Sequence, residues 1–154
     1  MDATNILIIE AYTDANIGSG SLAENSTNIL RKFYPKANIR IMAHHPESIS
    51  KLCHAETVAD IYLYPYGRKR IFQVFWLFNT LFWMATIFLQ VLFLQGRILF
   101  FKRKVKHLLW ADIVISIGAE RINDKFVKNI LFSLYTYTLV KMMNRKMILF
   151  PCTI

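Results

Sequence analysis

Short aliphatic runs alternate with amphipathic stretches along this chain. The aliphatic runs predict five β-strands, at residues 5–11, 38–43, 59–64, 111–117 and 146–150. Apolar residues at helical spacing predict the helices between them, over residues 21–33, 46–53, 71–96 and 124–143. Strands that alternate with helices predict an α/β fold. We therefore expect one domain with a Rossmann-like, doubly wound parallel sheet of about five strands.

The first predicted helix follows a loop over residues 12–19. Ser21 and Glu24 have the spacing of a capping box, which places the start of the helix at Ser21, and Pro35 stops it. Within the same stretch, residues 18–23 match the permissive G-x-G-x-x-A form of a dinucleotide-binding loop. A flexible turn before a capped helix explains these glycines equally well, and no acid follows the second strand to hold a ribose.

The segment at residues 71–101 is long and apolar, and residues 71–96 carry no charged side chain. At about 1.5 Å per residue this helix is long enough to span a bilayer. The alternatives are a helix that lies in the membrane surface and an oversized core helix. A single crossing would put the first three strands and the last two on opposite sides of the membrane. One half of the helix is wholly apolar and both ends are basic, which favours a crossover helix docked on an anionic membrane surface. The expected contacts are Arg68, Lys69, Arg70, Phe75, Phe78, Phe82, Lys102, Arg103 and Lys104.

The composition of the 154-residue chain agrees with a membrane-facing or partner-facing surface. Its residues are 55% hydrophobic, a larger share than in a typical soluble domain. Its net charge is +9. The basic clusters flank an apolar stretch, so we expect lipid headgroups and no nucleic acid. Cys53 and Cys152 lack C-x-x-C spacing, and the sequence shows no signal peptide, which predicts free thiols in a cytoplasmic protein. Together with the apolar helix and its basic flanks, this predicts a peripheral position on the inner face of the membrane.

Two groups of polar residues follow predicted strands, where α/β sheets bind ligands. His44 and His45, with Glu47 nearby, could hold a metal, but adjacent strand residues point in opposite directions, so we expect ordinary loop histidines and no metal or cofactor. The second group lies in residues 118–124 after the clearest strand. It fits a ligand site and a turn with a helix cap equally well.

Several motifs resemble, in order and spacing, the N-terminal half of the polysaccharide pyruvyl transferase family. They are N-I-L-I-I-E-A-Y-T-D-A-N-I-G at 5–18, L-R-K-F-Y-P at 30–35, A-N-I-R-I-M-A at 37–43, A-D-I-V-I-S-I-G at 111–118, N-D at 123–124 and K-M-I-L-F-P at 146–151. The resemblance implies half of a two-domain fold similar to B-type glycosyltransferases. It also implies transfer of pyruvate from phosphoenolpyruvate to a sugar of a bacterial surface polysaccharide, with a sugar or lipid-linked glycan as acceptor.

The resemblance further implies which residues bind substrate. They are Asn16, Gly18, Ser19, Gly118, Glu120, Asn123 and Asp124. Ser19 stands where the family has an acid, and Glu120 where it has a glycine. The family's second domain has no counterpart in residues 1–154, so we expect this chain alone to be inactive without that domain or a partner chain. The alternative is a non-catalytic, membrane-associated scaffold or subunit in polysaccharide biosynthesis; an unrelated dinucleotide-binding module is disfavoured.

Overall fold

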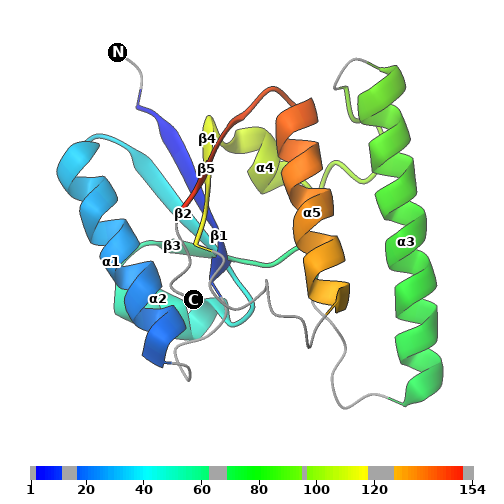
Figure 1. Cartoon of the computed structure of the whole chain (residues 1–154), viewed down its shortest axis with the longest axis horizontal. Helices are drawn as coiled ribbons and strands as arrows, with labels where there is room; N and C mark the ends of the chain where they lie inside the picture. Colours follow the sequence, from blue (N-terminus) through cyan, green and yellow to red (C-terminus); the bar gives the residue numbers. More distant parts are fainter. Residues whose placement is uncertain (1–2, 12–16, 63–68, 95–96, 118–126, 151–154) are drawn as a thin grey trace.

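The predicted α/β fold with a doubly wound parallel sheet is confirmed by the computed structural model, which describes residues 3–11, 17–62, 69–94, 97–117 and 127–150 (Figure 1). The strands are β1 (Asn5–Ala11), β2 (Asn38–Ala43), β3 (Glu56–Ala59), β4 (Ile113–Ser116) and β5 (Lys146–Leu149). They form one sheet in the order β3-β2-β1-β4-β5, and every neighbouring pair is parallel. The helices are α1 (Ile17–Phe33), α2 (Pro46–Cys53), α3 (Arg70–Phe93), α4 (Lys106–Trp110) and α5 (Val127–Met142).

Helices cover both faces of the sheet. Ile6 and Ile8 of β1 face α1 and α2, whereas Leu7 and Ile9 face the side of α3, α4 and α5. This alternation follows from the period of two in a strand. Strand β1 is central and is buried from Ile6 to Ala11, which explains why its sequence is almost continuously aliphatic.

Helix α1 begins at Ile17, four residues before the predicted start at Ser21. Gly18 and Ser19 therefore belong to its first turn and not to a loop, and Ser21 does not cap the helix. The buried positions of α1 include Gly20, Ala23 and Thr27, which recur at helical spacing. Small residues at these positions let the helix approach the sheet closely, so Gly20 contributes to packing and not to a turn.

The third strand was predicted at residues 59–64, but β3 spans Glu56–Ala59. Arg40 of β2 is paired with Glu56 in the sheet register, and the Arg40 Nε to Glu56 Oε2 distance is 2.7 Å. The apolar residues Ile61 and Tyr62 lie beyond the strand and pack into the core between the sheet and the helices α3 and α5. Their hydrophobicity therefore reflects helix packing, which sequence periodicity cannot distinguish from a strand.

Helix α3 lies outside α5, on the side away from the sheet (Figure 1). Tyr62 fills the space between them, stacked on Trp83 of α3 at 5.7 Å and on Phe132 of α5 at 4.6 Å between ring centroids. The Tyr135 hydroxyl of α5 donates a hydrogen bond to the Met84 carbonyl of α3 at 2.6 Å. Burial raises the pKa of both tyrosines, which keeps them in the neutral, donor-capable form.

Candidate functional site

The carboxyl ends of β1 and β4 lie side by side at the centre of the sheet. The Ile117 amide donates to the Ile9 carbonyl at 3.3 Å, just beyond the paired register of the two strands. From β1 the chain progresses outward through β2 and β3 and then crosses back to β4, so the strand order reverses between β1 and β4. Open α/β sheets bind their ligands at such a switch point, outside the carboxyl ends of the strands.

The predicted substrate-binding residues belong to the segments that leave this edge. Gly18 and Ser19 lie in the first turn of α1. The others, Asn16, Gly118, Glu120, Asn123 and Asp124, lie outside the described residues. Helices α1 and α5 both begin on the side where β1 and β4 end (Figure 1).

Sequence reasoning missed Glu10, the one acid within the first aliphatic strand. Its side chain is buried, with 9% of the residue exposed. Its carboxylate accepts hydrogen bonds from the Ser133 hydroxyl at 2.5 Å, from the Tyr137 hydroxyl at 2.6 Å and from the Ser116 hydroxyl. Because an isolated buried carboxylate is costly, a Glu inside an aliphatic run is a signal that hydrogen-bond donors lie nearby.

A bulge in β1 explains how Glu10 reaches these donors. Ile6 and Ile8 face α1 and α2, so strict alternation would turn Glu10 to the same side. Instead the register of β1 shifts between Ile8 and Ala11, and Glu10 has the left-handed backbone angle φ of 70°. The bulge therefore directs the carboxylate toward α5 and leaves Ala11 facing α1 and α2.

The Glu10 cluster connects three elements, β1, β4 and α5, at the carboxyl ends of the two strands. Ser116 ends β4, and Ser133 and Tyr137 lie one helical turn apart on α5. Non-glycine residues with positive φ are uncommon and concentrate at functional sites. The cluster fixes α5 against the carboxyl ends of β1 and β4, and thereby fixes where α5 begins.

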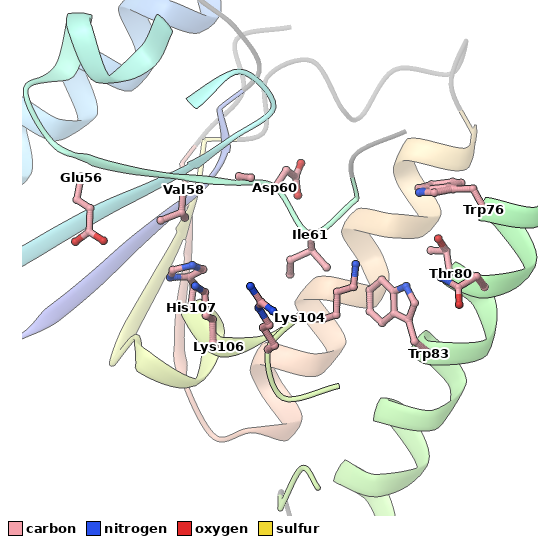
Figure 2. A pocket seen from close by; sticks show the side chains of 13 residues that line it. Glu56, Val58, Asp60, Ile61, Trp76, Thr80, Trp83, Lys104, Lys106 and His107 are labelled. Carbon is pink, nitrogen blue, oxygen red and sulfur yellow. The ribbon is translucent and has the colours of Figure 1, made fainter. Parts of the chain in front are cut away.

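A separate cavity of about 470 Å³ lies between β3, α3 and the segment that precedes α4 (Figure 2). Trp76, Thr80 and Trp83 line it from α3, Arg103 and Lys104 line it from the segment before α4, and Lys106 lines it from the first position of α4. His107 also lines the cavity, and burial lowers its pKa, with smaller contributions from Lys106 and Arg40. The pKa shift favours the neutral imidazole in a locally positive field.

The exposed side of α3 carries many large hydrophobic side chains. All seven residues of its predicted apolar half are exposed: Phe75, Phe78, Leu81, Phe82, Ala85, Leu89 and Phe93. The buried positions include Thr80 and Gln90, so the helix turns its more polar side inward. Only 33% of its most apolar 18-residue window is buried, which does not fit the core-helix alternative. We call these seven residues the outer face of α3.

Helix α3 ends at Phe93, earlier than the predicted residue 96, and the chain then returns along it. The Gln90 side-chain oxygen accepts hydrogen bonds from the Leu99 and Phe100 amides at 2.6 and 2.8 Å. The side chains of Leu99 and Phe100 are exposed. The returning segment therefore extends the apolar surface beyond the end of the helix.

Among the described residues, α3 is the helix long and apolar enough to cross a membrane. The strands before it and after it are hydrogen bonded in one sheet, because β1 pairs with both β2 and β4. A single crossing would separate these strands. The sheet is therefore incompatible with α3 spanning a bilayer once.

The predicted basic membrane contacts lie around the start of α3 and beyond its end in the sequence. Lys69 and Arg70 are exposed at the start of α3, and Lys102, Arg103 and Lys104 are exposed beyond its end, while Arg68 lies outside the described residues.

Of the cysteines, Cys53 is a free thiol as predicted, and burial raises its pKa; Cys152 is not described. The rings of His44 and His45 meet edge to face at 5.2 Å, and the described part of the chain contains no group of three metal-ligating side chains.

Comparison of the chain with protein-family models, curated proteins and solved structures finds no match.

Proposed function

We propose that this chain is a polysaccharide pyruvyl transferase-like domain, one half of an enzyme that transfers pyruvate from phosphoenolpyruvate to a sugar of a bacterial surface polysaccharide, and that the chain is inactive without the second domain or a partner chain. The adjacency of β1 and β4 carries this proposal. These two strands bear the motifs at 5–18 and 111–118 that resemble the family. Because they are neighbours, the two strands end side by side at the switch point, where open α/β sheets bind their ligands.

The start of α1 and the start of α5 support an anionic substrate. The first amides of a helix are free to donate hydrogen bonds, and its dipole favours negative charge. Phosphoenolpyruvate carries a phosphate and a carboxylate, so two helix starts at one edge suit it. Asn16, Gly18 and Ser19 from the first segment, and Gly118, Glu120, Asn123 and Asp124 from the second, are the proposed substrate contacts. Glu10 acts as a positioning residue, because it fixes α5 against β1 and β4.

Calorimetric titration of phosphoenolpyruvate into the full chain tests the substrate assignment. We expect saturable binding that Asn123→Ala weakens by about tenfold, equivalent to the loss of about 1.4 kcal/mol of binding free energy. Asn28→Ala, an exposed position on α1, is the matched control and should bind as the wild type does. Absence of binding heat at millimolar ligand, with the protein folded, would contradict the proposal.

A non-catalytic, membrane-associated scaffold or subunit in polysaccharide biosynthesis is the second candidate, and the outer face of α3 favours it. Burial of this face against lipid would remove a large apolar area from water. The start of α3 supports an anionic surface, because Lys69 and Arg70 stand at the positive end of the helix dipole and its first turn holds no acid. Cations there oppose helix stability, and a negatively charged membrane would offset this cost. A peripheral position on the cytoplasmic face of the membrane follows from this proposal.

Vesicle flotation tests the docking that both candidates share. We expect the protein to float with anionic vesicles, less so as salt is raised, and Phe78→Ser with Phe82→Ser to abolish flotation. Phe33→Ser is the control, because Phe33 is 72% exposed against 68% for Phe78 but lies on α1, on the opposite layer. Flotation without phosphoenolpyruvate binding would favour the scaffold over the transferase. Equal flotation of all variants would refute docking through α3.

A further inference from the structure

The cavity beside α3 has the size and the lining of a small-molecule site. Its volume of about 470 Å³ falls within the usual range of such sites. Trp76, Asn79, Thr80 and Trp83 recur at helical spacing and form one wall. In Figure 2, Lys104 extends into the cavity beside Trp83, and the distance from its Nζ to the ring centroid is 5.8 Å.

The charge of the cavity favours an anion. Arg103, Lys104 and Lys106 contribute three cations to its lining, and the ion pairs between described residues involve none of them. Of the two carboxylates that line it, Glu56 is held by Arg40 at 2.7 Å. The other, Asp60, is buried and its Oδ1 accepts a hydrogen bond from the Tyr62 amide at 3.4 Å. The accessible charge is therefore positive.

The side-chain types favour phosphate among anions. A guanidinium donates two parallel hydrogen bonds to a phosphate, and lysine amines add compact charge around it. Asn79 and Thr80 contribute neutral polar groups for the rest of a headgroup. Phosphate recognition with room for a small polar substituent follows from this combination.

The rim of the cavity continues into the outer face of α3. Asn79 lines the cavity and is exposed. Phe75 and Phe82, four residues before and three after it, are its neighbours on the helix surface and belong to the outer face. A molecule with its phosphate in the cavity could therefore extend an acyl chain along α3.

We propose that this cavity binds the phosphate of an anionic phospholipid headgroup, held by Arg103, Lys104 and Lys106 next to the apolar face of α3. The inference rests on the proposed docking of α3 on the membrane. It adds a defined headgroup site to what would otherwise be general attraction between a basic protein and an anionic surface.

The first experiment uses a soluble headgroup and no membrane. Glycerol 3-phosphate is titrated into the full chain while tryptophan fluorescence is followed, since Trp76 and Trp83 line the cavity. We expect a saturable change, with about tenfold weaker affinity in Arg103→Gln and in Lys106→Gln. Lys102→Gln is the matched control: it removes the same charge from the same segment, but Lys102 does not line the cavity. Equal titrations of Arg103→Gln and Lys102→Gln would overturn the site.

The second experiment distinguishes a lipid from a free phosphate compound. Flotation is compared on phosphatidylcholine vesicles that contain phosphatidic acid or, at matched surface charge, a fatty acid without phosphate. We expect Arg103→Gln to lose more flotation than Lys102→Gln on the phosphatidic acid vesicles and the same amount on the fatty acid vesicles. If Arg103→Gln and Lys102→Gln lost equal flotation on both kinds of vesicle while the wild type still bound glycerol 3-phosphate, the cavity would be assigned to a free phosphate compound. That result would overturn the lipid assignment. Failure of the wild type to float on any anionic vesicle would refute the docking of α3 and the lipid assignment together.

Discussion

The Tyr137 hydroxyl donates a hydrogen bond to the Glu10 carboxylate over 2.6 Å, across 127 positions of sequence. This contact joins the central strand to the helix that follows β4. Hydrogen bonds to buried charged groups are among the stronger ones in proteins, because the carboxylate has lost its water.

Removing this hydroxyl should destabilise the domain. We expect Tyr137→Phe to lower the free energy of unfolding by about 1.5–3 kcal/mol, the usual range for a hydrogen bond to a charged group. Urea denaturation measures the change. Tyr34→Phe, at an exposed position, should alter it by less than about 0.5 kcal/mol. Similar midpoints for the two variants would mean that the cluster does not stabilise the fold.

Substitutions on the two sides of α3 should differ in their effect on the stability of the domain. Ile87 is fully buried, so Ile87→Ala should cost about 2–5 kcal/mol of unfolding free energy through lost packing and the cavity left behind. Phe78→Ser on the outer face should change stability by about 0.5 kcal/mol or less and should reduce self-association. Denaturation and light scattering measure the two effects. A large stability loss in Phe78→Ser would show that the outer face is covered within the protein itself.

Gln90 should hold the returning segment against the end of α3. Gln90→Met keeps the length of the side chain but removes the oxygen that accepts from the Leu99 and Phe100 amides. We expect hydrogen exchange at these two amides to accelerate by about tenfold, and exchange in β1 to stay unchanged. Unaltered exchange at Leu99 and Phe100 would refute a role for Gln90 in holding the segment.

His107 should make stability depend on mild acid. Its pKa in the folded protein is lowered from the ordinary 6.5, mainly by burial, so the unfolded chain binds the proton more readily. The stability that His107 contributes is therefore complete above pH 6.5 and is lost as the pH falls through the folded pKa. His107→Gln should flatten this decline relative to the wild type. Denaturation midpoints between about pH 5 and 7 test it. Parallel pH profiles for wild type and His107→Gln would contradict the assignment.

Local sequence chemistry was sufficient for several elements. Strands β1 and β2 and helix α2 have the predicted bounds. An aliphatic run buried on both faces, such as β1, has few alternatives to a central parallel strand, and Pro46 is suited to the first turn of a helix. The alternation of such elements was enough to predict the parallel sheet. The sequence also revealed the apolar half of α3, since helical periodicity alone defines it.

Long-range packing decided the rest. Periodicity placed a strand at residues 59–64, but Tyr62 is apolar because it fills the space between α3 and α5. Sequence reasoning missed Glu10; strict alternation along β1 would turn it toward α1 and α2, and a bulge turns it instead to donors more than a hundred residues away in sequence. The outer face of α3 was visible as a pattern, but only the fold determined that it faces outward. Composition and period describe how a segment prefers to pack, whereas the partner that it packs against exists only once distant segments have come together.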